Sequence, residues 1–503
     1  MIKRYVFGTP LETDAVLNKP AACRDKPPYL GKCENALIYK MDEEDIVYGL
    51  GENVRGMNKR GWIYESNCTD DPVHLEETKS LYGAHNFILV SGEKQFGLFL
   101  DTPGKVVFDI GYTNSSQLKI TLEDGDYELY LIDGGTPDDI ITWFRELIGP
   151  SYLPPKWAFG FGQSRWSYAS SEEVRKVAAR YRENHIPLDS IYLDIDYMER
   201  YKDFTIDREA FPDFEQLAED MKQQGIHLVP IIDGGVKIED GYDVYEEGVK
   251  NGFFCKDEDG DDFVVGVWPG KCHFPDMLDE KARAWFGDKY KFLLDKGIEG
   301  FWNDMNEPAI FYSEKRLKKE FEKLEEYRKM NLDVNTFFEF QDLVSTISKN
   351  PEDYRSFYHT YKGKRIRHDK VHNLFGYFMT RSAGEAFERL EPDKRILMFS
   401  RASYIGMHRF GGIWTGDNKS WWSHILLNLK MMPSLNMCGF LYSGADIGGF
   451  GADATQDLVL RWMALGIFMP LMRDHSARGT RRQEAYAFED MEAGSFPIST
   501  ANL

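Results

Sequence analysis

Eight short apolar segments recur between residues 159 and 475, and helix-like stretches lie between most of them. The segments are residues 159–164, 190–197, 227–233, 297–305, 395–400, 411–417, 438–446 and 467–475. Apolar strands that alternate with helices are typical of a parallel sheet covered by helices. Eight such units predict a (β/α)8 barrel. A doubly wound open sheet is the alternative, but no G-x-G-x-x-G sequence lies between a strand and a helix.

The first 150 residues follow a different pattern. Short apolar or alternating segments at 87–90, 96–101, 105–111 and 118–122 are separated by Gly, Asn, Asp and Ser. This pattern is typical of an antiparallel β-sandwich. Three prolines between residues 149 and 157 interrupt any regular element. We therefore predict a β-sandwich domain at 1–150 and a barrel domain at 151–489.

Two insertions interrupt the barrel pattern, at about 234–285 after the third strand and at about 306–370 after the fourth. The second contains a highly charged helical pattern at 314–330, which predicts a solvated surface helix. No helical pattern of sufficient length follows Phe488, so the last barrel helix is expected to be missing and residues 490–503 to form a disordered tail.

Composition excludes several classes of protein. The net charge of −21 argues against binding to nucleic acid, which requires clustered positive charge. Six irregularly spaced cysteines form neither a disulfide framework nor a C-x-x-C metal site. The N-terminus has no signal-peptide pattern, and no apolar stretch has the length of a membrane span. These features predict a soluble cytoplasmic protein.

Polar residues collect at the carboxyl ends of the predicted strands. They are Asp194, Asp196, Asp233, Asp304, Arg401, Asp417 and His475. In barrels this end of the strands carries the active site. One acidic strand end would carry little information, but a series of them beside Trp302 and Trp414 predicts a functional site.

Two acidic patterns suggest metal binding, and neither is well supported. Asp194 and Asp196 form a D-x-D sequence, but no His or further acid completes a ligand shell. The glycine in residues 257–262 (DEDGDD) comes too early for the calcium-binding loop of an EF-hand. The twelfth position counted from Asp257 is Trp268, whereas an EF-hand has Glu there. We expect an exposed turn there and no metal site.

The segment G-F-W-N-D-M-N-E-P at 300–308 is the most informative. Asp304 follows an apolar strand, where it could be a nucleophile or the N-cap of the next turn. Glu307 could be a second catalytic carboxylate or the partner that orients a hydrogen-bond network.

This segment resembles the nucleophile signature of glycoside hydrolase family 31, a family of retaining α-glucosidases. Further segments resemble the family in the same order, and the resemblance covers roughly residues 40–489. These segments are YGLGEN (48–53), LDIDYM (193–198), FSRAS (399–403), IWTGDN (413–418), GADIGGF (444–450) and MRDH (472–475).

The resemblance implies a role for each matching residue. Asp304 is the expected nucleophile and Asp417 the expected acid/base. Asp194 is expected to grip sugar hydroxyls, with Arg401 beside the acid/base and His475 as a hydrogen-bond partner of the hydroxyls. The expected walls of the pocket are Trp268, Trp302, Trp414, Met305 and Phe450. Asp233 and Asp70, the latter from an N-terminal loop, match the family pattern less specifically. No cofactor is implied.

The chemistry explains why two carboxyl groups are needed. A retaining glycosidase places them about 5 Å apart, one to attack the anomeric carbon and one to protonate the leaving oxygen. Burial or negative neighbours should raise the pKa of the acid/base, whereas an arginine and hydrogen bonds should keep the nucleophile ionised.

The expected activity is exo-acting, retaining release of terminal non-reducing α-linked glucose from small oligosaccharides. An α-xylosidase is the alternative within the family, and a transglycosylase or lyase would begin from the same glycosyl-enzyme. A catalytically impaired, carbohydrate-binding truncation product is the alternative of another class. This alternative is considered because members of the family continue beyond the barrel into β-domains, whereas the family pattern in this sequence stops near residue 489. We expect the missing helix to leave an apolar groove over the eighth and first strands, which would make the chain prone to aggregation and weakly active. Neither linkage preference nor oligomeric state follows from the sequence.

Overall fold

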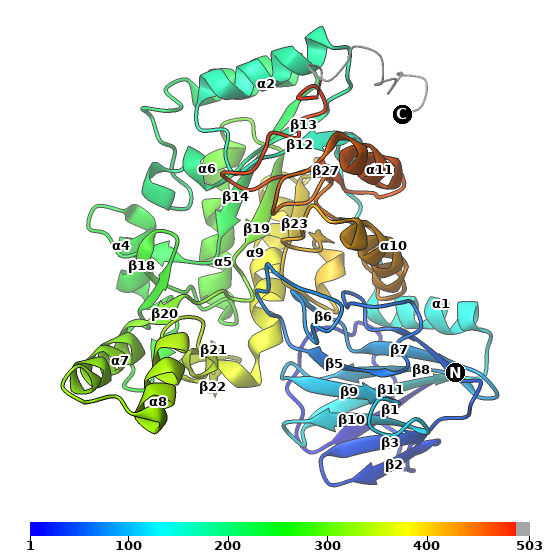
Figure 1. Ribbon diagram of the computed structural model, residues 1–503. Helices are drawn as coiled ribbons and strands as arrows, with labels where there is room; N and C mark the ends of the chain where they lie inside the picture. Colours follow the sequence, from blue (N-terminus) through cyan, green and yellow to red (C-terminus); the bar gives the residue numbers. More distant parts are fainter. Residues whose placement is uncertain (489–503) are drawn as a thin grey trace.

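The computed structural model describes residues 1–488, which form a strand-rich N-terminal part and a parallel barrel (Figure 1). The tail predicted at 490–503 lies outside the described residues. Within them, no helix is long and apolar enough to cross a membrane.

The N-terminal part consists of two antiparallel sheets. One has the order β1 (Ile2–Phe7), β11 (Tyr127–Asp133), β8 (Gln95–Asp101), β7 (Phe87–Ser91), β4 (Ile46–Gly49). The other has the order β2 (Leu30–Cys33), β3 (Ala36–Lys40), β10 (Gln117–Leu122), β9 (Val106–Ile110), β5 (Trp62–Ser66). Side chains alternate along β10, where Leu118, Ile120 and Leu122 enter the core between the sheets. The predicted antiparallel sandwich is confirmed.

Helix α1 (Pro137–Ile148) covers the outer face of the first sheet and leads into the barrel. Its start is set by a capping box, in which Thr136 and Asp139 each bond the backbone N–H of the other. The ring of Phe144 stacks on Phe87 of β7 at 3.8 Å between centroids. This cover explains why β8 and β11 are buried on both faces.

Each of the eight predicted barrel segments contains a parallel strand. They are β12 (Phe161–Gln163), β13 (Ser190–Leu193), β14 (His227–Asp233), β19 (Gly300–Asp304), β23 (Leu397–Ser400), β25 (Gly412–Trp414), β26 (Ser443–Gly444) and β27 (Met472–Asp474). In the described residues they form one sheet in which β27 pairs with β12. The remaining gap is bridged where Leu471 N–H donates to Ser443 O at 3.2 Å. The predicted (β/α)8 barrel is confirmed.

Helices surround these strands. They are α2 (Ser171–Glu183), α3 (Phe214–Gln223), α5 (Glu280–Lys289), α6 (Lys291–Leu294), α9 (Phe375–Leu390), α10 (Trp422–Met437) and α11 (Gln456–Gly466). Helix α2 shows how local residues define such a helix. Ser170 caps its N-terminus, and two glutamates in its first turn interact favourably with the helix dipole. Val174, Val177 and Tyr181 form its buried face.

The two insertions form joint sheets. The first holds β15 (Val236–Lys237), α4 (Asp243–Asn251), β16 (Lys256–Asp257), β17 (Val265–Val267) and β18 (Gly270–His273). The second holds β20 (Tyr312–Ser313), α7 (Glu314–Tyr327), α8 (Val334–Ser345), β21 (Phe357–Tyr361) and β22 (Lys364–Arg367). Strand β17 pairs with β20 and β16 with β21, so the two insertions support each other. The acidic run at 257–262 is a turn in which Asp257 Oδ1 accepts from the N–H groups of Asp259 and Asp261.

The described chain after β27 is short. Residues 475–488 contain turns and no helix, and Tyr486 packs edge-on against Tyr181 of α2. Phe161, Leu471 and Met472, on or beside the first and eighth strands, are buried, and the apolar groove expected over these strands stays a prediction. Large exposed apolar side chains lie on α10 and on the turn that follows α11, where Phe468 is 81% exposed.

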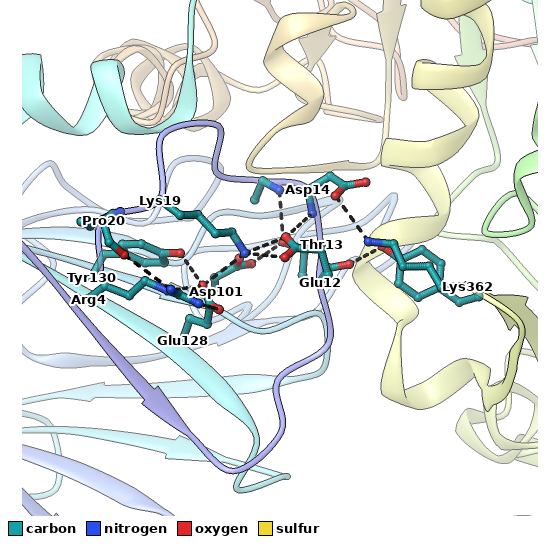
Figure 2. A network of polar contacts seen from close by, with 12 residues as sticks. Arg4, Glu12, Thr13, Asp14, Lys19, Pro20, Asp101, Glu128, Tyr130 and Lys362 are labelled. Carbon is teal, nitrogen blue, oxygen red and sulfur yellow. Dashed lines mark hydrogen bonds and ion pairs between the residues drawn. The ribbon is translucent and has the colours of Figure 1, made fainter. Parts of the chain in front are cut away.

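An N-terminal loop joins the sandwich to the barrel side (Figure 2). Thr13 donates to Asp101 of β8 at 2.6 Å, and Lys19 pairs with both oxygens of Glu12 at 2.7 Å. Asp14 lies 3.7 Å from Lys362 of the second insertion. Through Thr13 and Asp14 the loop therefore connects the sandwich with the second insertion.

Candidate active site

A cavity of about 270 Å³ lies at the carboxyl ends of the barrel strands. Its lining includes every predicted site residue except Asp233: Asp70, Asp194, Trp268, Trp302, Asp304, Met305, Arg401, Trp414, Asp417, Phe450 and His475. Residues more than 400 positions apart therefore meet in one place.

Asp304 is the last residue of β19. Met305, which follows it, has φ 56°, and its N–H donates to Asp304 Oδ1 at 2.7 Å. Arg401 Nε lies 3.0 Å from the same oxygen. Burial raises the pKa of Asp304, while Arg401 and the Met305 amide oppose that rise by stabilising the carboxylate.

Glu307 is fully buried and does not line the cavity. Its two carboxylate oxygens accept from Arg401 Nε and Nη2 at 2.9 Å each. Such a two-point ion pair fixes the plane of the guanidinium. Of the two interpretations left open by the sequence, the geometry favours Glu307 as the residue that orients Arg401.

Asp417 follows β25 and contrasts with Asp304. No described residue donates a hydrogen bond to its carboxyl group. Burial raises the pKa of Asp417 to about 8; Arg401 opposes the rise, and the charges of Asp304 and Asp70 add to it. Asp417 can therefore hold a proton at neutral pH, as a general acid must.

Asp194 and His475 lie together on another side of the cavity. Asp194 Oδ1 accepts from Ile195 N–H at 2.8 Å, and its Oδ2 lies 3.8 Å from His475 Nε2. Burial raises the pKa of Asp194 and lowers the pKa of His475. The His475 ring stacks on Phe450 at 4.9 Å and meets Trp302 edge-on at 5.5 Å.

Asp233 does not line the cavity, although it pairs in register with Asp304 on the neighbouring strand. It is 2% exposed, and its N–H donates to Asp203 Oδ1 at 2.9 Å. Burial raises the pKa of both carboxyl groups. Direct contact between Asp233 and a sugar stays a prediction.

Asp70 reaches the cavity from the sandwich. The loop that carries it is fixed where Cys68 N–H donates to Asn373 Oδ1 at 2.9 Å and where Cys68 O accepts from His372 Nε2 at 2.7 Å. Asp70 then pairs with Lys349 at 2.9 Å and lies 3.8 Å from Arg401.

The sequence did not identify Lys349 or Phe311 as site residues, yet both line the cavity. They come from the second insertion, which has no strand end to mark them. Trp166, Trp268 and Phe311 form an aromatic group at the cavity, with Trp268 5.4 Å from Trp166 and 5.0 Å from Phe311. Apart from the family pattern, no sequence signal indicated this group.

Possible metal ligands lie elsewhere. Asp196 does not join Asp194 in the cavity, because β13 ends at Leu193 and Asp196 instead pairs with Arg478 at 2.6 Å. The two carboxylates of the D-x-D sequence therefore do not line one cavity. Cys255, Asp276 and His359 cluster within the insertions, where His359 Nδ1 and Asp276 Oδ1 are already joined at 2.7 Å.

Comparisons with known proteins agree with this geometry. The glycosyl hydrolases family 31 TIM-barrel domain matches residues 151–497, and the glycosyl hydrolase 31 N-terminal galactose mutarotase-like domain matches residues 24–109. Alpha-glucosidase 2 of Bacillus thermoamyloliquefaciens is 38% identical over 89% of this chain and 52% of its own length. The alpha-glucosidase of Saccharolobus solfataricus is 30% identical over 87% of this chain and 61% of its own length.

Among solved structures, the Flavobacterium johnsoniae GH31 dextranase FjDex31A, complexed with glucose, superposes with a TM-score of 0.76. The two chains are 25% identical, and the match covers 90% of this chain and 52% of the dextranase. The chain thus spans a little over half the length of these relatives. Because the barrel-domain model matches well over half of the chain and includes both candidate carboxylates, the protein belongs to glycoside hydrolase family 31.

Proposed function

We propose that this chain is an exo-acting retaining α-glucosidase that releases terminal non-reducing α-linked glucose from oligosaccharides. The observation that carries the proposal is the contrast between two carboxyl groups at one cavity. Asp304 has a cation at 3.0 Å and an amide donor at 2.7 Å, whereas among the described residues Asp417 has no ion pair and no hydrogen-bond donor, and burial raises its pKa to about 8. Opposite environments for two carboxyl groups separate a nucleophile from an acid.

In the first step, Asp417 gives its proton to the glycosidic oxygen while Asp304 attacks the anomeric carbon. The bond to the leaving group breaks and a β-linked glucosyl ester of Asp304 forms. In the second step, Asp417, now ionised, takes a proton from water as the water oxygen attacks the same carbon. The ester breaks, α-glucose leaves, and both carboxyl groups return to their starting states.

The remaining cavity residues have binding roles in this proposal. Asp194, His475 and Arg401 would contact sugar hydroxyls, and the apolar walls would come from Trp302, Trp414, Met305 and Phe450. Trp268 would meet the leaving-group side with Trp166 and Phe311. Asp70 and Asp233 would act mainly through charge, since Asp70 is paired with Lys349 and Asp233 does not line the cavity.

Exo-action is supported by the size of the cavity. Its volume of about 270 Å³ lies below the roughly 300–1,000 Å³ typical of pockets that enclose drug-sized ligands. A cavity of this size suits one terminal sugar better than an internal stretch of polysaccharide.

Glucose is proposed over xylose because the matched curated relatives are named α-glucosidases. The proposal predicts faster turnover of 4-nitrophenyl α-glucoside than of 4-nitrophenyl α-xyloside, and a preference for the xyloside would overturn it.

The retaining mechanism is tested by hydrolysing maltose and following the products by proton NMR. The quantity measured is the anomeric configuration of the glucose released from the non-reducing end, before it mutarotates. Retention predicts that α-glucose appears first and then mutarotates, whereas β-glucose as the first product would contradict it. Absence of any glucose from a well-folded chain would favour the carbohydrate-binding alternative.

A cytoplasmic location is also part of the proposal. All six cysteines lie in the described residues, and none is in a disulfide. Reduced cysteines are typical of the cytoplasm. Cell fractionation tests this, and recovery of the protein from the exported fraction would contradict it.

A further inference from the structure

A chain of three buried histidines runs from the first insertion to the sandwich. His359 lies on β21, and the other two begin the short 3₁₀ helices η5 (His368–Lys370) and η6 (His372–Leu374). Each of the three residues is at most 4% exposed. The mechanism proposed above uses none of these rings.

Hydrogen bonds join the three rings through all of their nitrogen atoms. At one end, Asp276 Oδ1 lies 2.7 Å from His359 Nδ1. His359 Nε2 lies 2.9 Å from His368 Nδ1, and His368 Nε2 lies 2.8 Å from His372 Nδ1. At the other end, His372 Nε2 lies 2.7 Å from the carbonyl oxygen of Cys68. Four hydrogen bonds in series therefore connect the first insertion with the sandwich.

The direction of these bonds follows from the Cys68 end. A carbonyl oxygen can only accept, so His372 Nε2 carries a proton. Burial lowers the pKa of His372 to about 4 and the pKa of His368 well below its ordinary value, so both rings are neutral at neutral pH. A neutral ring donates from one nitrogen and accepts at the other, so each bond between the rings points toward Cys68.

The opposite end of the chain is anchored by a carboxyl group. His359 Nε2 donates to His368, and His359 Nδ1 faces Asp276. The second oxygen of Asp276 accepts from Thr360 N–H at 2.6 Å. With a proton on His359 Nδ1, both oxygens of Asp276 accept, and the bond between these two residues is charge-assisted. Such bonds are about twice as strong as neutral ones, so the chain is held firmly to the first insertion.

Aromatic neighbours fix the planes of the rings. Phe357 stacks on His368 with 4.2 Å between the centroids, and Tyr354 meets His372 edge-on at 5.0 Å. Rotation of either histidine would break two hydrogen bonds and this packing together. The chain is therefore a stiff connection.

Cys68, at the end of the chain, is held on both sides by consecutive residues. Its carbonyl oxygen accepts from His372, and its N–H donates to Asn373 Oδ1 at 2.9 Å. Asp70 follows two residues later and lines the active-site cavity. Burial is the main cause of the raised pKa of Asp417, and the charge of Asp70 adds to it. The place of the Cys68 backbone therefore affects the proposed acid.

We propose that the histidine chain positions Asp70, and that His372 is a positioning residue for the glycosidase reaction. His372 holds the Cys68 carbonyl, while His359 and His368 hold the ring of His372. The effect on turnover rests on the proposed function, whereas the effect on the loop does not. Breaking the chain at Cys68 releases the segment that carries Asp70.

The first test uses two variants that keep different ends of the His372 ring. Glutamine reaches about as far as Nε2 and can still donate to the Cys68 carbonyl, whereas asparagine reaches only about as far as Nδ1. Hydrogen exchange at residues 66–71 should be about two- to ten-fold faster in His372→Asn, since one hydrogen bond is lost, and close to the parent rate in His372→Gln. Exchange in α2 should not change in either variant, which excludes general destabilisation.

The second test compares KM with kcat on maltose. His372→Asn should raise KM about two- to five-fold with little change in kcat, because Asp70 leaves its ion pair. The alkaline decline of kcat/KM, set by the pKa of about 8 of Asp417, should move to lower pH because a neighbouring negative charge has moved away. Both changes should be small in His372→Gln.

A double-mutant cycle shows whether His372 acts through Asp70. Asp70→Asn should raise KM and lower the pH of the decline in the same way. Adding His372→Asn to Asp70→Asn should change neither quantity further, because the group that His372 positions is already absent. A merely structural role of His372 would instead make the two effects add.

Three results would overturn the proposal: unchanged exchange at residues 66–71 in His372→Asn, equal impairment of His372→Gln and His372→Asn, and additive effects in the double variant. His368→Asn loses the bond to His372 and should speed exchange at the same residues, so the test remains decisive if His372→Asn does not fold. Exchange is measured without substrate. A parent chain without turnover would therefore contradict the proposed function, while the exchange rates would still decide whether the chain holds the loop.

Discussion

The raised pKa of Asp417 makes the pH dependence of glycoside cleavage predictable. The first chemical step requires the protonated acid, so kcat/KM should follow its protonated fraction. With a pKa of about 8, that fraction is about 99% at pH 6, about half at pH 8 and about one tenth at pH 9. Activity on maltose should therefore decline on the alkaline side around pH 8 instead of around pH 4, where an exposed aspartate titrates.

The assay is kcat/KM for maltose from about pH 5 to pH 10, with stability checked at each pH. Asp417→Asn should lower kcat/KM about 10²- to 10⁴-fold on maltose, since general acid catalysis contributes that much. With α-glucosyl fluoride, whose leaving group needs little protonation, the loss should be small and the alkaline decline should disappear. The assignment of Asp417 as the acid would be contradicted if Asp417→Asn retained the alkaline decline, or if the parent chain lost activity near pH 4–5 as the pH rises.

Three other perturbations have directions set by the structure. Glu307→Gln leaves the buried Arg401 without its two-point charged partner. The free energy of unfolding in urea should therefore fall by about 3 kcal/mol. Unchanged stability would contradict the role of this pair. Burial raises the pKa of Asp101 to about 7, above the unfolded value of about 3.9. The native state therefore binds this proton more tightly and is stabilised at low pH. The free energy of unfolding should fall by up to about 4 kcal/mol as the pH rises from about 4 to about 7. Asp101→Asn should flatten that dependence, and a stability profile that keeps its slope would refute the assignment. Lys349→Met removes a half-exposed ion pair with Asp70. KM for maltose should therefore rise about two- to five-fold with little change in kcat. A fall in kcat that is larger than the rise in KM would contradict a binding role for Lys349.

The barrel was predictable because its strands are buried and end in polar residues. Segments such as β14 and β19 are apolar runs that finish on Asp233 and Asp304, so one pattern indicates both the strand and its functional end. The sandwich strand β10 was predictable from its alternation. Strand lengths were less predictable: residues 438–446 contain only the short strand Ser443–Gly444, since backbone pairing depends on neighbours that the local sequence does not specify.

The site was predictable where a residue follows a barrel strand and matches a family pattern. Lys349 and Phe311 were missed because they come from an insertion whose path over the cavity depends on pairing with another insertion. Glu307 was ambiguous because a carboxylate near a strand end can face either the cavity or the core. Glu307 is fully buried and does not line the cavity, so it faces the core, where it holds Arg401 at 2.9 Å.

The central claim is that Asp304 is the nucleophile and Asp417 the acid/base of a retaining reaction. The most direct measurement is the anomeric configuration of the glucosyl azide formed when azide rescues Asp417→Ala on an activated α-glucoside. The proposed intermediate is β-linked to Asp304, and azide attacks it with inversion, so we predict an α-glucosyl azide. Asp304→Ala, which cannot form the intermediate, should instead give the β anomer by direct displacement. A β-glucosyl azide from Asp417→Ala would contradict the assignment of the two carboxyl groups.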